Sequence, residues 1–216
     1  MWVIKVGGSL LESRKPSLLN LVRTLVRLRK KTPLVVLTGG GSYADCVRAL
    51  DRKHSLGSGA SHWTAVLAMH LNAYRLARFS REAFSLTTRP AQSPPSKIAL
   101  FLPLDLLRRA DLPKTWDVTS DSIAAFLASR LNARLLLAKT VDGVIDPFPG
   151  GKLLREVSAD DLLRLQSSPV DAYLPLFLSA HRMDAWLANG LFPERLESIV
   201  KGQDTVASHI LPRTRR

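Results

Sequence analysis

Apolar runs that end in glycine alternate with a helical pattern along the first part of the chain. Residues 2–6 form an apolar, β-rich run with one lysine inside it, and residues 34–37 form a continuous apolar run; both are of the kind that forms buried strands. Each run opens into glycines, at 7–8 and at 39–41, and residues 16–31 between the runs show apolar positions at helical spacing. This order predicts a βαβ unit with glycine loops at the carboxyl ends of parallel strands, where α/β proteins bind ligands.

The same patterns predict further elements in the rest of the chain. Helices are expected at 42–53, 62–78, 104–109, 120–131, 160–166 and 181–189, the last ended by Gly190, and strands at 98–102, 134–138 and 206–211. Residues 89–97 are rich in proline and serine and predict an exposed loop. We therefore expect an α/β fold, a three-layer αβα sandwich with a mostly parallel central sheet. No repeat or linker is evident, so one domain is expected over residues 1–211, with a basic, flexible tail at 212–216.

Length, hydrophobicity and cysteine content narrow the class of protein. The chain has 216 residues, of which 46% are hydrophobic, enough for a sizeable core. No apolar run reaches the ~18 residues of a membrane helix, and the first apolar stretch lacks the basic flank of a signal peptide. The single cysteine, Cys46, excludes an internal disulfide and fits a reducing compartment. We therefore expect a cytoplasmic protein that does not associate with membranes.

The net charge of +13 points to an anionic partner. The basic residues are scattered and are not interleaved with aromatic residues, as they are on surfaces that bind single-stranded nucleic acid. The distribution therefore does not favour nucleic acid, whereas a small, highly phosphorylated substrate would be attracted by such a field.

Lys5 lies inside the first apolar run, where an unpaired ammonium group would be costly to bury. Either its side chain reaches the surface, or an anion lies at the carboxyl end of the strand. Gly7, Gly8 and Ser9 follow directly, and a glycine turn lets backbone N–H groups approach a phosphate closely. From these residues alone, a plain strand and a phosphate site both remain open.

Three motifs in order carry a resemblance to a known family. They are IKVGGSL at 4–10, LTGGGSYAD at 37–45, and VTSDSIAAFLASRLNARLLLAKTVDGVID at 118–146. Together they resemble the amino acid kinase family, which includes acetylglutamate, uridylate and isopentenyl phosphate kinases. The resemblance implies an α/β kinase that uses ATP, with Mg²⁺ held mainly by phosphates and water and no metal ligand set on the protein.

Residues 39–77 are similar to a smaller group within that family, the kinases of methanofuran biosynthesis. The similarity implies transfer of a phosphoryl group to a small phosphate monoester, [5-(aminomethyl)furan-3-yl]methyl phosphate, to give a diphosphate. Isopentenyl phosphate and a nucleoside monophosphate remain alternative acceptors, and a non-catalytic nucleotide-binding regulatory protein is the alternative of another class. An amine on the acceptor calls for a nearby carboxylate, for which Asp45 and Asp51 are candidates. The sequence does not determine the oligomeric state and is compatible with a homo-oligomer.

The resemblance also assigns roles to individual residues. Lys5 would bridge the transferred group, Asp121 would hold Lys5 by an ion pair, and Lys139 would add a second positive charge. The residues that would bind ATP are Gly7, Gly8, Ser9, Thr140, Asp142, Gly143 and Val144. The residues that would bind the acceptor are Gly39, Gly40, Gly41, His62, Thr119 and Ser120.

The chain departs from the family pattern because it lacks the second catalytic lysine at the expected late position. Several family members place a catalytic lysine late in the chain, but residues 171–180, DAYLPLFLSA, contain none. Charge between two phosphates still needs neutralising. Lys139 is the first candidate for this charge, and Lys152, in the loop at 149–152, is the second.

Overall fold

The computed structural model describes residues 1–90, 93–94, 96–147, 150–165 and 167–212. Apart from Pro212, the predicted tail at 212–216 lies outside the described residues. The domain boundary at residue 211 therefore stays a prediction.

Within the described residues, one eight-stranded sheet forms the centre of the molecule, in the order β3-β4-β2-β1-β5-β9-β10-β8. Its strands are β1 (Trp2–Val6), β2 (Leu34–Thr38), β3 (Phe84–Thr87), β4 (Ile98–Phe101), β5 (Arg134–Lys139), β8 (Glu156–Ser158), β9 (Ala185–Asn189) and β10 (Ser208–Leu211). Neighbouring strands run parallel except β9 and β10, which are antiparallel. A separate antiparallel hairpin pairs β6 (Val144–Ile145) with β7 (Leu153–Leu154).

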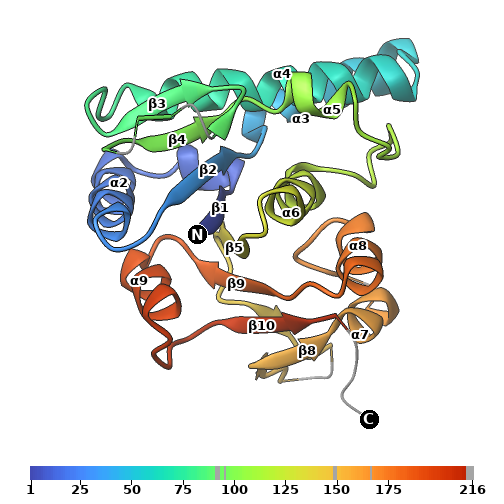
Figure 1. Ribbon diagram of the computed structural model, residues 1–216. Coiled ribbons are helices and arrows are strands. Elements are labelled where there is room, and N and C mark those ends of the chain that lie inside the picture. Colours follow the sequence, from blue (N-terminus) through green and yellow to red (C-terminus); the bar gives the residue numbers. More distant parts are fainter. Residues whose placement is uncertain (91–92, 95, 148–149, 166, 213–216) are drawn as a thin grey trace.

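Helices cover both faces of this sheet, which confirms the predicted α/β, three-layer architecture. The helices are α1 (Gly8–Leu11), α2 (Lys15–Arg29), α3 (Gly41–His54), α4 (Ser58–Ala77), α5 (Leu104–Leu107), α6 (Ser120–Arg130), α7 (Ala159–Arg164), α8 (Tyr173–His181) and α9 (Pro193–Lys201). Figure 1 shows α2 and α9 on one side of the sheet and α6 and α8 on the other. The long helix α4 packs beside the edge formed by β2, β4 and β3.

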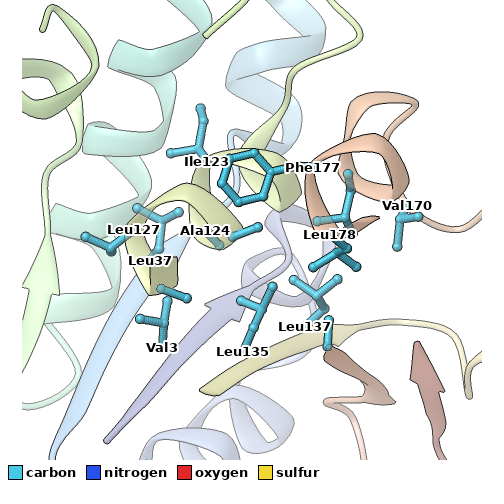
Figure 2. Close-up of a cluster of buried hydrophobic side chains, with 14 of the residues drawn as sticks. Val3, Leu37, Ile123, Ala124, Leu127, Leu135, Leu137, Val170, Phe177 and Leu178 are labelled. Carbon is cyan, nitrogen blue, oxygen red and sulfur yellow. The ribbon is translucent and has the colours of Figure 1, made fainter. Parts of the chain in front are cut away.

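Side-chain alternation along β1 and β5 decides which residues face α6. On β1, Val3 belongs to the core beneath α6 and α8, whereas Ile4 belongs to the core beneath α2. On β5, Leu135 and Leu137 likewise face α6, together with residues of α8 (Figure 2). Because strand side chains alternate with period two, Lys5 and Lys139 continue these two rows and point to the α6 face.

The predicted helix at 181–189 is wrong. The helix α8 ends at His181, where Arg182 adopts a left-handed backbone conformation with φ of 52°. Residues 185–189 form β9, which pairs with β5 on one side and β10 on the other. Gly190 therefore follows a strand and caps no helix. A short apolar run fits a buried strand as well as a helix, and its partners decide between them.

Other elements were missed or misplaced. The patterns gave no sign of β3, of the short strands β6, β7 and β8, or of the helices α1, α8 and α9. Helix α4 begins at Ser58, four residues before the predicted start, with Gly57 as its N-cap residue. The remaining predicted helices and strands of the first 140 residues match observed elements within a few residues.

The two glycine loops pack directly against each other at the carboxyl ends of β1 and β2. A Cβ atom on Gly8 would lie 2.1 Å from the backbone nitrogen of Gly41, and one on Gly39 would lie 2.7 Å from that of Gly8. Gly41 also has a positive φ of 52°, which disfavours other residues. The absence of side chains here is thus a packing requirement between the loops.

We expect Gly8→Ala to lower the free energy of unfolding by about 1–3 kcal/mol, because the added methyl group meets backbone that cannot move cheaply. Gly59→Ala, inside α4, is the matched control, since nothing lies within 4 Å of its Cβ position. Alanine favours a helix over glycine, so the control should gain up to about 1 kcal/mol. Urea denaturation measures both, and equal stabilities would contradict the packing argument.

Candidate active site

Three charged side chains meet where β1 and β5 end beneath α6. The ammonium group of Lys5 lies 2.8 Å from one carboxylate oxygen of Asp121, and that of Lys139 lies 2.5 Å from the other. Lys5 and Asp121 are only 4% and 2% exposed, so this is a buried ion pair. The structure thus brings together the three residues that the sequence assigned to catalysis.

Burial and charge act in opposite directions on this cluster. Burial lowers the pKa of Lys5, and the positive charge of Lys139 adds to that effect, while Asp121 opposes it. Burial alone would raise the pKa of Asp121, but the two ammonium groups outweigh it and lower that pKa to about 2. Asp121 is therefore ionised at neutral pH and holds both lysines in place.

The low pKa of Asp121 makes folding sensitive to acid. A carboxylate whose pKa falls from 3.8 to about 2 on folding stabilises the native state above pH 4, and this stabilisation disappears as the pH drops to about 2. The loss amounts to about 2 kcal/mol. We expect the free energy of unfolding of the wild type to fall more steeply over this interval than that of Asp121→Asn. Denaturant titrations at each pH measure these free energies. An equal fall in both proteins would contradict the assigned role of Asp121.

A segment just before α8, which sequence reasoning missed, supports the cluster. The carboxylate of Asp171 accepts hydrogen bonds from the backbone N–H and hydroxyl groups of Thr119 and Ser122, and from the N–H of Leu174. Lys139 also donates to the carbonyl of Pro169. Burial raises the pKa of Asp171, and the nearby charge of Asp121 raises it further. Asp171 thus fixes the first turn of α6, which carries Asp121. The one local signal was an aspartate just before a helix, where its carboxylate can accept a free N–H of the first turn, as Asp171 does from Leu174.

Helix α4 holds the second glycine loop through another residue that was missed, Asn72. Its side chain is fully buried, and its amide donates to the carbonyl oxygens of both Gly39 and Gly40 at 2.8 Å. Its own carbonyl accepts from Arg75. The amide nitrogen of Asn72 therefore fixes the loop, and Arg75 satisfies its oxygen.

The loop at the start of α3 already binds an anionic group. The backbone N–H of Ser42 donates to the carboxylate of Glu12 at 2.5 Å. Free N–H groups at a helix start favour anions, because the helix dipole adds to their partial positive charge. The first turn of α3 is therefore suited to a phosphate oxygen, which would take the place of the Glu12 carboxylate.

A cleft opens between the glycine loops, α3, α4 and the start of α6. Its volume is about 180 Å³, below the roughly 300–1,000 Å³ of typical drug-sized sites, so it suits a small molecule. All six predicted acceptor residues line it: Gly39, Gly40, Gly41, His62, Thr119 and Ser120. Gly8, Ser9, Asp45, Arg48, Thr115 and Trp116 also line it. His62 is buried, and this burial lowers the pKa of its imidazole.

The other residues predicted to bind ATP do not line this cleft: Gly7 follows β1, and Thr140, Asp142, Gly143 and Val144 come after β5. Gly7 donates its N–H to Ala138, which extends the pairing of β1 with β5. Thr140 is exposed. Asp142 accepts hydrogen bonds from Asn189 and Arg195, which lower its pKa. Gly8 and Ser9, also predicted to bind ATP, do line the cleft, and they follow Gly7 directly in the chain. They therefore connect the two regions.

Gly143 and Val144 are buried at the start of the β6–β7 hairpin. The N–H of Val144 donates to the hydroxyl of Ser208, and its side chain belongs to the hydrophobic core. A Cβ on Gly143 would lie 2.3 Å from that hydroxyl, so this turn is closely packed. Any contact of Val144 with a nucleotide would therefore involve its backbone. Lys152 is exposed, just before β7.

Within the described part of the chain, no group of three or more histidine, cysteine, aspartate or glutamate side chains is placed to hold a metal ion. The described side chains alone therefore do not form a cage for Mg²⁺. No described helix is long and apolar enough to cross a membrane.

The fold and the paired glycine loops define an α/β protein of the phosphate-binding kind, and sequence comparison specifies it further. The model of the amino acid kinase family matches residues 1–97 and 95–182, and the chain belongs to this family. It is 33% identical over 215 residues to the [5-(aminomethyl)furan-3-yl]methyl phosphate kinase of Methanocaldococcus jannaschii, covering 98% of each chain.

Solved structures agree on the fold. The uridylate kinase of Archaeoglobus fulgidus matches with a TM-score of 0.75 and 19% identity, over 97% of this chain and 99% of that one. The UMP kinase of Bacillus anthracis matches with a TM-score of 0.73 and 17% identity, over 98% and 95%. At this level of identity the likeness concerns the fold.

Proposed function

We propose that the protein is an ATP-dependent kinase whose acceptor is the phosphate group of [5-(aminomethyl)furan-3-yl]methyl phosphate. The observation that carries the proposal is the buried Lys5–Asp121–Lys139 cluster beside a small cleft lined by two glycine loops. The identity of 33% along the whole chain to the kinase of M. jannaschii supports this acceptor over the alternatives.

In the proposed reaction, an oxygen of the acceptor phosphate attacks the γ-phosphorus of ATP. The new P–O bond forms as the bond to the β,γ-bridging oxygen breaks, which gives a diphosphate and ADP. A phosphate monoester is largely dianionic at neutral pH, since its second pKa is about 6, so the attacking oxygen needs no general base. Catalysis then depends on position and on neutralising charge.

The residues of the chain divide this work between them. Lys5 bridges the transferred group, and Lys139 supplies a second positive charge beside it. Asp121 fixes both ammonium groups so that they need not reorganise during transfer. Backbone N–H groups of Gly8 and Ser9 bind the ATP phosphates. The N–H of Gly7, the third residue predicted for this role, is already donated to Ala138, so Gly7 contributes close backbone approach rather than a hydrogen bond.

Other described residues hold the ends of the two substrates. The loop at 39–41, with Thr119 and Ser120, binds the acceptor phosphate, and His62 lies against the acceptor. Thr140 and the turn at 142–144 hold the nucleotide. Magnesium would arrive bound to the ATP phosphates and neutralise part of their charge.

The test is to incubate the purified protein with ATP, Mg²⁺ and one of three acceptors: the aminomethylfuran phosphate, isopentenyl phosphate or UMP. Phosphorus NMR detects the diphosphate, and ADP release gives the rate. We expect the highest kcat/KM with the furan. Turnover of another acceptor alone would reject the proposed substrate. ATP binding without turnover of any acceptor would instead favour a non-catalytic nucleotide-binding protein.

A further inference from the structure

One face of α3 forms a wall of the cleft from its inner end to its mouth. Gly41, Ala44, Asp45 and Arg48 all line the cleft, at the spacing i, i+3, i+4 and i+7 that places residues on one helix face. Gly41 belongs to the glycine loop at the inner end. Asp45 lies one turn further along, about 6 Å at the helical rise of 1.5 Å per residue. The inner end of the wall, at the glycine loop, therefore favours an anion, and the end at Asp45 favours a cation.

Asp45 is the one carboxylate among the described residues that line the cleft. The other candidate for an amine contact, Asp51, accepts the indole N–H of Trp116 at 2.9 Å and does not line the cleft. The guanidinium carbon of Arg48 lies 4.6 Å from the centre of the Trp116 ring, so this aromatic wall is fixed from two sides. Asp51 thus has a structural partner, and Asp45 faces the substrate space.

Asp45 forms an ion pair with Arg48, and replacing Arg48 by another cation costs little free energy. Its carboxylate lies 2.8 Å from Arg48, but their side chains are 70% and 40% exposed. Exposed ion pairs contribute little to stability. If another cation takes Asp45, Arg48 keeps its contact with the ring of Trp116. The chain carries a net charge of +13, so a carboxylate at the cleft mouth opposes the prevailing sign of the protein.

We propose, on the basis of the proposed function, that Asp45 selects the acceptor by binding its ammonium group. The acceptor is then recognised as a zwitterion, with its phosphate at the glycine loops and its ammonium at Asp45, and its ring lies between them beside Trp116. Arg48 then gives up Asp45 but keeps its contact with the ring of Trp116. Phosphate monoesters without an ammonium group lack the cation that Asp45 binds, so they gain nothing at the mouth of the cleft.

The experiment compares two acceptors that differ only in the amine: [5-(aminomethyl)furan-3-yl]methyl phosphate and (5-methylfuran-3-yl)methyl phosphate. The variants are Asp45→Asn and Asp51→Asn. The second removes the same charge from the same helix, while its amide oxygen still accepts the indole N–H of Trp116. Steady-state kcat/KM is measured for both acceptors with each protein, and melting temperatures verify that the variants fold.

We expect the wild type to prefer the amine about tenfold or more, as for a hydrogen bond to a charged group. Asp45→Asn should lose most of this preference through a higher KM for the amine, and Asp51→Asn should keep it. The inference is overturned if Asp45→Asn retains the preference or if Asp51→Asn loses it instead. A wild type inactive with both acceptors would overturn the proposed function, whereas an active wild type with an unchanged ratio in Asp45→Asn would overturn this inference alone.

Discussion

Replacing Lys5 with methionine should lower kcat at least a hundredfold. The ammonium group is held by Asp121 at the carboxyl end of β1, next to the loop that we propose binds the phosphates. Removing one preorganised charge from a site that stabilises developing negative charge typically costs a factor of 10² to 10³ in rate. Single-turnover measurements with ATP and the furan acceptor report this loss directly.

The variant should still fold, because Asp121 keeps Lys139 as its partner and methionine preserves most of the volume of the lysine stem. Lys31→Met, at an exposed position after α2, is the control and should leave kcat unchanged. A Lys5 variant with nearly wild-type turnover would show that the buried lysine has only a structural role.

Local sequence patterns were sufficient where the chain itself determines the geometry. The alternation of side chains along residues 2–6 places Lys5 on the same face as Val3. The same alternation along β5 places Lys139 on the face of Leu135 and Leu137. The glycines that follow each strand require close backbone packing, and they occur where the two loops meet. The lysines and glycines of the site could therefore be found in short motifs, but their roles came from the resemblance to the kinase family and not from the patterns alone.

The supporting residues could not be predicted, because their partners are distant in sequence. Asn72 contacts a loop more than thirty positions away, and Asp171 contacts Thr119 and Ser122 about fifty positions away. Nothing in a local pattern distinguishes a buried asparagine on α4 from an exposed one. Such long-range hydrogen bonds appear only when the helices are placed on the sheet.

The error at 181–189 has the same origin. The segment AWLAN is short and apolar, and neither its length nor its composition excludes a helix. Its hydrogen-bond partners are β5 and β10, which come from other parts of the chain. The site was little affected, because the cluster depends on β1, β5 and α6, which had been placed correctly.

Lys139→Met should slow phosphoryl transfer at least tenfold, because this residue is the proposed second charge. The structure supports the choice of Lys139 over Lys152: its ammonium lies 2.5 Å from Asp121, and its side chain is 19% exposed, at the end of β5. Lys152 is exposed and lies on the β6–β7 hairpin. Lys152→Met is therefore the matched control, and we expect it to keep the wild-type rate.

The double variant tests whether the two lysines act as one unit. Both ammonium groups share the carboxylate of Asp121, so removing either one changes the position and charge of the other. Groups that act together have non-additive effects, so Lys5→Met combined with Lys139→Met should cost less than the product of the single losses. Single-turnover rates measure the chemical step, and melting temperatures separate a loss of folding from a loss of catalysis. A silent Lys139→Met together with a slow Lys152→Met would assign the second charge to the hairpin.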